Sequence, residues 1–148
     1  MNTIQSLKSI MIISLLTASS ISFGKDNVIP YSELPIPIKT YINSHFPNYK
    51  VLKVETDNDL LSKEYEIKLS KGIEIEFNGK KNVIKNIGGD SKLPDNVIPL
   101  KIRQYVKSNY PKSFIKEWDL ENTYQSVKLN NDIELKFTMG GDFIKADD

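Results

Sequence analysis

LPIPIKTYINSHFP, residues 34–47, returns in altered form as IPLKIRQYVKSNYP, residues 98–111. Aligning Pro47 with Pro111 also aligns other identical residues: Pro30 with Pro94, Pro35 with Pro99, Tyr41 with Tyr105 and Ser44 with Ser108. Further along, YEIKLSKGIEIEF (residues 65–77) matches QSVKLNNDIELKF (residues 125–137) after a short deletion in a polar loop. Agreement over two segments of each half indicates an internal duplication.

The first segment of each copy has the apolar spacing of an amphipathic helix. Apolar residues recur at i, i+4, i+7 and i+8, which are Leu34, Ile38, Tyr41 and Ile42 in one copy and Ile98, Ile102, Tyr105 and Val106 in the other. Pro35 and Pro99 suit a helix start, and Pro47 and Pro111 suit its end. A helix of about three turns is unstable alone, so its apolar stripe must pack on another surface.

The second segment alternates with period two, as a strand with one buried face does. The loop Ser70-Lys71-Gly72 has the length of a three-residue hairpin connection. That length predicts a register, which sets Leu69 opposite Ile73, Lys68 opposite Glu74 and Glu66 opposite Glu76. The second copy then has Leu129 opposite Ile133, Lys128 opposite Glu134 and Ser126 opposite Lys136.

Two more strands are expected beside each hairpin, at residues 51–56 and 81–87 and at residues 115–120 and 142–146. The predicted fold class is therefore α+β: a two-layer tandem duplication of a helix plus four-stranded antiparallel sheet unit. The first copy is assigned to residues 25–88 and the second to residues 89–148. Gly88-Gly89-Asp90 is predicted to be the linker between them.

Residues 1–24 have the pattern of a secretory signal peptide. They contain Lys8, an apolar run at residues 10–16, and the small residues Ser22 and Gly24 where a signal peptidase would cut. The run is far shorter than the roughly 20 residues that a membrane-spanning helix needs. We expect a periplasmic or secreted protein with no membrane span after cleavage; a retained N-terminal anchor is the alternative.

Composition excludes several classes of function. The chain has 20 basic and 19 acidic side chains, and Lys8 is the only charged one in residues 1–24, so the remainder is balanced. A neutral chain without a basic stripe has no electrostatic drive toward nucleic acid. The absence of cysteine from the sequence excludes disulfides, thiol chemistry and a lipid-modified cysteine.

The sequence offers no combination of residues suited to catalysis. His45 is the only histidine, and we interpret it as a surface residue favoured by the helix C-terminus rather than as a catalytic group or metal ligand. Without cysteine or a second histidine, an ordinary zinc site cannot form. We therefore expect no catalytic residues, no metal site, no cofactor and no enzyme activity. Trp118 aligns with Val54 and is predicted to lie in the core, with an exposed binding anchor as the alternative.

Charged side chains crowd the polar face of the two hairpins. The pair Glu66 and Glu76 costs stability unless lysines on neighbouring strands neutralise it. We predict that this face binds a partner through Glu64, Glu66, Lys68, Glu74, Glu76, Lys128, Glu134 and Lys136. A basic patch on a partner protein would fit the glutamates. The alternative is a small-ligand or calcium site on the acidic face of the first hairpin.

These motifs resemble a known family. Leu-Pro before the helix, Tyr41-Ile42, Phe46-Pro47, the hairpin at residues 65–77 and Asn78-Gly79-Lys80 are similar to the PepSY-like secreted proteins of Gram-negative bacteria. The fold of that family is likened to the beta-lactamase inhibitor protein. The resemblance implies a duplicated α+β fold and leaves open whether the two sheets join. In the second copy Gln125 stands where the first has Tyr65, which allows a β-bulge near Tyr124.

The resemblance also implies a function. The family is regarded as non-enzymatic and is thought to bind or inhibit proteins of the envelope. We therefore predict a non-catalytic protein-binding module, periplasmic or secreted, whose partner is an envelope or extracellular protein. Inhibition of a peptidase or another enzyme is the sharper form of this prediction, and it rests on analogy of fold.

Overall fold

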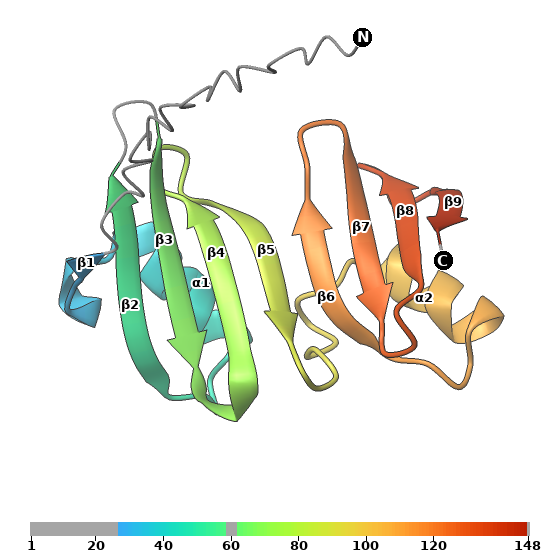
Figure 1. Ribbon diagram of the computed structural model, residues 1–148, viewed down its shortest axis with the longest axis horizontal. Helices are drawn as coiled ribbons and strands as arrows, with labels where there is room; N and C mark the ends of the chain where they lie inside the picture. The colour runs from blue at the N-terminus through green and yellow to red at the C-terminus, as the bar shows by residue number, and fades with distance from the viewer. Residues whose placement is uncertain (1–26, 59–61, 148) are drawn as a thin grey trace, which may run out of the picture.

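The computed structural model describes residues 27–58 and 62–147, and the strands within them form one sheet (Figure 1). The strands are antiparallel and lie side by side in chain order. Their bounds are β1 Asn27–Val28, β2 Val51–Asn58, β3 Lys63–Leu69, β4 Ile73–Asn78, β5 Val83–Gly89, β6 Ile115–Leu120, β7 Tyr124–Leu129, β8 Glu134–Thr138 and β9 Phe143–Asp147. The helices are the 3-10 turns η1 (Tyr31–Glu33) and η2 (Ser70–Gly72), and α1 (Ile36–His45) and α2 (Leu100–Asn109). The predicted signal peptide, residues 1–24, lies outside the described residues.

The predicted fold class, a tandem helix plus four-stranded sheet unit, is wrong, because the described strands form a single nine-stranded antiparallel sheet with two short α-helices. The last strand of the first half, β5, pairs with the first strand of the second half, β6. The strand β1, which the sequence did not predict, pairs with β2 through Asn27 and Val28. Both pairings cover strand edges that two separate sheets would leave open to other chains.

The predicted linker is also wrong, because Gly88 and Gly89 are the last two residues of β5. At Gly89 a Cβ atom would lie 2.7 Å from the carbonyl oxygen of Gly72. Glycine is therefore required at this position for the backbones to approach closely.

The two helices form where the apolar spacing predicts them. Pro35 and Pro99 are the residues before the first helical turn, and each helix ends just before the residue that precedes Pro47 or Pro111. Both α1 and α2 lie on the same face of the sheet, behind the strands in Figure 1. Their buried side chains are Ile38, Ile42, Ile102 and Val106.

In each half an edge-on aromatic contact helps to fix the helix to the sheet. The Tyr41 ring meets Phe77 edge-on at 5.8 Å between ring centroids, and Tyr105 meets Phe137 in the same way at 5.4 Å. Burial raises the pKa of both tyrosines. Such edge-to-face pairs contribute on the order of 1 kcal/mol beyond the area they bury. The matching contacts confirm that both tyrosines belong to the buried stripe.

The hairpin registers are as predicted from loop length. In the first hairpin Leu69 pairs with Ile73, and Glu66 pairs with Glu76. In the second hairpin the paired residues include Lys128 with Glu134 and Ser126 with Lys136. In the first loop both Lys71 and Gly72 have positive φ, at 64° and 69°, and in the second loop Asp132 does, at 67°. Two loops of different sequence therefore give the same pairing.

The bulge considered near Tyr124 is absent from the described hairpin, since Tyr124 to Lys128 pair with Thr138 to Glu134 without a shift. Gln125 takes the place of Tyr65 and is 3% exposed. Its Oε1 accepts a hydrogen bond from Trp118 Nε1 at 2.9 Å, and its Nε2 donates to the carbonyl oxygens of Thr138 and Met139, each at 3.1 Å. A buried amide is tolerated here because its polar atoms have partners.

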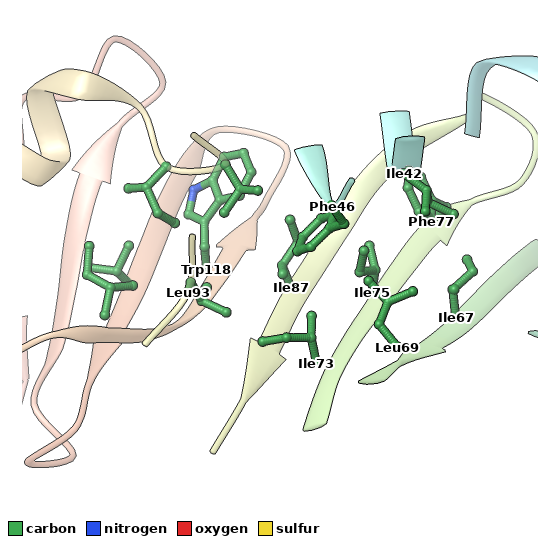
Figure 2. Close-up of a cluster of buried hydrophobic side chains, with 14 of the residues drawn as sticks. Ile42, Phe46, Ile67, Leu69, Ile73, Ile75, Phe77, Ile87, Leu93 and Trp118 are labelled. Atoms are coloured by element: carbon green, nitrogen blue, oxygen red, sulfur yellow. The ribbon is translucent and has the colours of Figure 1, made fainter. Parts of the chain in front are cut away.

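A single row of apolar side chains crosses the sheet from β2 to β9. Its members, paired strand by strand, are Val54, Ile67, Ile75, Ile87, Trp118, Val127, Leu135 and Ala146. Trp118 is 8% exposed, which confirms its predicted place in the core. Figure 2 shows Ile87, Leu93 and Trp118 together where the two halves meet, so the core continues across the junction.

A continuous core predicts that the two halves unfold together. Phe77→Ala empties a fully buried site in the first half and should lower the free energy of unfolding by about 3–5 kcal/mol. Trp118, the only tryptophan, reports on the second half. Its fluorescence transition in urea should therefore shift to lower urea together with the circular dichroism transition. Phe137→Ala in the second half is the matched variant. An unchanged fluorescence midpoint in Phe77→Ala would mean that the halves fold independently.

Candidate functional site: the open face of the sheet

Both helices lie on one face of the sheet, and we call the other face the open face (Figure 1). The side chains on the open face are mostly polar. Strand pairing places two neighbouring rows of side chains across it. The first row is Glu55, Glu66, Glu76, Asn86, Asp119, Ser126, Lys136 and Lys145. The second row is Lys53, Lys68, Glu74, Gly88, Glu117, Lys128, Glu134 and Asp147.

Lysines lie beside carboxylates towards both ends of the sheet, so opposite charges neutralise each other there. The Nζ atom of Lys68 lies 3.9 Å, 3.1 Å and 3.5 Å from carboxylate oxygens of Glu55, Glu66 and Glu74. At the far end Lys136 lies 3.7 Å from an Asp147 oxygen. The prediction that lysines neutralise the like-charge pairs is therefore confirmed. Because these pairs are exposed, each contributes less than about 1 kcal/mol to stability.

Lys85 completes this neutralisation from a bulge in β5. The pairing of β4 with β5 shifts register beside Lys85. Its Nζ lies 2.7 Å from Glu64 Oε1 and also hydrogen-bonds the Glu76 carboxylate. The hydrogen bond from Lys85 lowers the pKa of Glu64, against the effect of partial burial. Desolvation acts to lower the pKa of Lys85, but the two glutamates outweigh it and the pKa is raised. Glu64 and Lys85 are therefore both charged at neutral pH.

Every predicted partner-binding residue has a place on the open face, but the structure does not bring them all together. Glu64, Glu66, Lys68, Glu74 and Glu76 lie on β3 and β4, whereas Lys128, Glu134 and Lys136 lie on β7 and β8. Strands β5 and β6 separate the two groups. Their role in binding stays a prediction.

Sequence reasoning missed the residues between the two groups. These are Lys85, Asn86, Glu117 and Asp119, which lie on β5 and β6 of the open face. Their position depends on the pairing of β5 with β6 and on a bulge, which have no short-range sequence signal. The polar alternation within residues 115–120 was the available hint for the last two.

A hollow of about 410 Å³ lies on the open face where the two halves join, and we call it the junction hollow. In the second row Gly88 stands between Glu74 and Glu117, so two carboxylates flank a position without a side chain. A Cβ atom on Gly88 would lie 3.5 Å from Asn86 Oδ1 and 3.6 Å from Glu117 Cγ, which are ordinary contact distances. Unlike Gly89, Gly88 is not required by packing. Lys116, Lys128 and Asp90 also line the hollow.

Asn86 organises the acidic groups beside the junction hollow. Its Nδ2 donates to Glu117 Oε1 at 3.1 Å and to Asp119 Oδ1 at 2.6 Å. Burial raises the pKa of Asp119; the bond from Asn86 opposes this, and the charges of Glu117, Glu121 and Glu134 add to it. The centre of the open face therefore holds negative charge at some cost to stability.

A smaller acidic hollow of about 200 Å³ lies on the first half of the open face. It is lined by Glu55, Asp57, Glu64, Glu66 and Glu76. The Oδ1 atom of Asp57 is buried there without a hydrogen-bond partner. Within the described residues, no group of three or more histidine, cysteine, aspartate or glutamate side chains is arranged to hold a metal ion.

His45 has a structural role. Its ring stacks on Tyr41 at 4.0 Å, and its Nδ1 lies 3.0 Å from the Tyr41 carbonyl oxygen. This agrees with its interpretation as a residue of the helix C-terminus. Among the described helices, none is long and apolar enough to cross a membrane.

Comparison with family models finds one that matches this chain twice. It is described as "Putative beta-lactamase-inhibitor-like, PepSY-like" and covers residues 21–85 and 88–145. The two matches support two repeated segments, although the segments share one sheet. No curated protein matches the chain.

Three solved structures from Bacteroides are similar to this one. One from Bacteroides vulgatus, described as a "putative periplasmic protein from DUF2874 family", has a TM-score of 0.75 and 31% identity over 84% of this chain and 98% of its own. A "putative calcium-regulated periplasmic protein" from Bacteroides thetaiotaomicron has a TM-score of 0.77 and 30% identity, over 83% and 97%. A third, a "putative periplasmic protein of unknown function" from Bacteroides vulgatus, has a TM-score of 0.76 and 30% identity, over 84% and 100%.

Asp119 gives a pH-dependent prediction. Its folded-state pKa is raised, so its contribution to stability is full below the unfolded pKa and is lost as pH rises through the folded pKa. Asp119→Asn keeps an oxygen for Asn86 and removes the charge. We expect this variant to be about 0.5–1 kcal/mol more stable than wild type at pH 7. The gain should vanish near pH 3, as measured by urea unfolding. Glu33→Gln, an exposed change on η1, is the control, and a loss of stability at pH 7 in Asp119→Asn would contradict the account.

Proposed function

We propose, because the chain belongs to the PepSY-like, beta-lactamase-inhibitor-like family, that it is a non-catalytic protein-binding module of the bacterial envelope. Three similar structures are described as periplasmic, which supports this location. Both helices cover one face of the sheet, so the other face is available to a partner (Figure 1). We assign the partner contact to this open face.

The observation that carries the proposal is the junction hollow. Glu74 and Glu117 flank Gly88, whose missing side chain is not a packing requirement. A lysine or arginine side chain of a partner would fit over Gly88 and reach both carboxylates. Charge-assisted hydrogen bonds of this kind are among the stronger polar contacts of interfaces. Lys116 and Lys128, which also line the hollow, would pair with acidic groups of the partner that lie next to its basic side chain, and these contacts would fix the orientation of the partner.

The sharper form of the proposal is inhibition of an envelope peptidase or of another enzyme. Its support is the description of the family as inhibitor-like, which is an analogy of fold. A basic side chain seated in the junction hollow would hold the open face against the surface of the inhibited enzyme. Inhibition would then result from steric cover and would need no catalytic group on this chain.

Filling the junction hollow tests the proposal. Gly88→Thr places a β-branched side chain in a strand position with room for it, so the fold should be retained. We expect the variant to capture its main partner from envelope extract at least about tenfold more weakly than wild type, a change of ~1.4 kcal/mol. Quantitative mass spectrometry of the captured proteins is the measurement, with loss of peptidase inhibition as a second readout.

The matched variants separate charge from shape. Glu74→Gln together with Glu117→Gln should weaken capture of the same protein, and raising the salt concentration should do so as well. Glu33→Gln, an exposed change on η1, should have no effect. If Gly88→Thr retains the same proteins in the same amounts as wild type, the junction hollow is not the contact.

A second candidate function is calcium binding in the acidic hollow of the first half. Its five carboxylates and the unpartnered Asp57 Oδ1 favour it, and one similar protein is described as calcium-regulated. Lys68 and Lys85 oppose it, because calcium would have to displace ammonium groups that already pair with four of these carboxylates.

Calorimetry tests whether the acidic hollow binds calcium. A calcium site of this kind should bind with a dissociation constant of about 10⁻⁴–10⁻³ M, the range of extracellular modules. The heat should be reduced in Asp57→Asn and unchanged in Asp142→Asn, whose carboxylate lies outside the hollow. Calcium titration without heat and without a change in melting temperature would remove this candidate.

A further inference from the structure

The two halves share one backbone frame at the start of each helix, so they can be compared side chain by side chain. The N–H of Glu33 donates to the Pro30 carbonyl oxygen at 3.0 Å, and that of Val97 donates to Pro94 at 3.2 Å. The first hydrogen bond of each helix is also the same, at 3.1 Å. A side chain in one half therefore has a structural counterpart in the other.

In the first half a tyrosine fills the space between η1 and α1. The Tyr31 ring is partly buried against the core. Its hydroxyl donates to Asn43 Oδ1 at 3.2 Å and lies 3.5 Å from the Lys39 carbonyl oxygen. Desolvation raises the pKa of Tyr31, although the hydrogen bond with Asn43 acts in the opposite direction. In the first half the phenol ring of Tyr31 therefore lies between apolar side chains and a polar group of α1.

In the second half the corresponding positions have lost their aromatic rings. Asp95 is the counterpart of Tyr31, and Ser113 is the counterpart of Tyr49. Tyr49 packs edge-on against Phe46 at 5.3 Å in the first half. Replacing both tyrosines by small polar residues removes two rings from the same part of the frame. We therefore expect an opening beside α2 that has no equivalent beside α1.

A hollow of about 490 Å³ lies at that place, and we call it the helix-side groove. Buried apolar side chains form its walls, among them Leu93, Ile98 and Val106. Leu100 lies at its edge and is 59% exposed. The groove therefore has apolar side chains in its walls and is accessible from the helix side of the sheet.

The rim of the helix-side groove is cationic. Lys92, Arg103 and Lys107 line it together with the single carboxylate of Asp95. Lys92 lies 2.9 Å from an Asp95 oxygen, and its hydrogen bond lowers the pKa of Asp95. Arg103 lies 3.9 Å from the other oxygen and donates from Nε to the Ile98 carbonyl oxygen at 3.1 Å. Three cations against one anion favour a ligand with negative charge.

We propose that the helix-side groove binds a tyrosine side chain in an acidic segment of a partner polypeptide. The ring enters as Tyr31 does in the first half. The hydroxyl of the bound tyrosine points toward Lys107. Lys107 is the counterpart of Asn43, whose Oδ1 accepts a hydrogen bond from the Tyr31 hydroxyl in the first half. Carboxylates on either side of the tyrosine face Lys92 and Arg103. This contact lies on the helix side of the sheet and is independent of the open face.

Titration with a defined peptide tests the proposal. The probe is the acetylated and amidated tripeptide Glu-Tyr-Glu, followed in ¹H–¹⁵N spectra of the full chain. We expect saturable shifts confined to amides around the groove, such as those of Ile98, Arg103 and Lys107, with a dissociation constant below about 1 mM. The peptides Glu-Ala-Glu and Lys-Tyr-Lys, which lack the ring or reverse the charge, should bind at least tenfold more weakly.

Two protein variants and a control complete the test. Asp95→Tyr copies the first half and fills the groove, so it should abolish the shifts. Lys107→Glu leaves the groove open and should weaken binding at least tenfold, whereas Lys81→Glu in the first half should leave it unchanged. Equal binding of Glu-Ala-Glu, binding that survives Asp95→Tyr, or no shifts at millimolar peptide would overturn the proposal. Concentration-dependent broadening of the groove amides without peptide would replace it with a second copy of the chain as the occupant.

Discussion

The pairing of β5 with β6 is the constraint on which the rest of the structure depends. Only a short stretch is involved, with Ile87 opposite Trp118 at its centre. Because side chains alternate strictly along a strand, this register aligns the apolar row of one half with that of the other. A shift by one residue would turn Trp118 to solvent and place Asp119 in the core. The hydrophobic effect therefore specifies how the two halves join.

The same register decides the chemistry of the open face. Towards both ends of the sheet, lysines lie beside carboxylates, as Lys68 does beside Glu66 and Lys136 beside Asp147. At the junction this neutralisation is interrupted, because Gly88 stands between Glu74 and Glu117. The duplicated sheet thus places carboxylates on both sides of an open position where its halves meet. Neither half alone could form that arrangement.

Local features of the fold were predictable from sequence, and long-range ones were not. Apolar spacing located both helices, and loop length gave the pairing of Glu66 with Glu76, because both depend on residues close in the chain. The linker prediction failed because Gly88 and Gly89 have the composition of a linker but complete β5. Part of the candidate site was missed for the same reason. The glutamates of the first hairpin were found, but Glu117 and Asn86 become neighbours only through the pairing of β5 with β6.

Duplication also supplies an internal control for function. At Gly89 the glycine has a structural explanation, because a Cβ atom there would meet a carbonyl oxygen. Gly88 and the change from Tyr31 to Asp95 are of another kind, because the frame accepts a larger side chain at either place. Each leaves a hollow, beside charged side chains at Gly88 and beside apolar walls at Asp95. Each hollow reduces the surface that the fold buries, and a larger side chain at the same position would avoid that loss. Because the fold does not need these two openings, selection for binding is the simpler explanation of the small residues that form them.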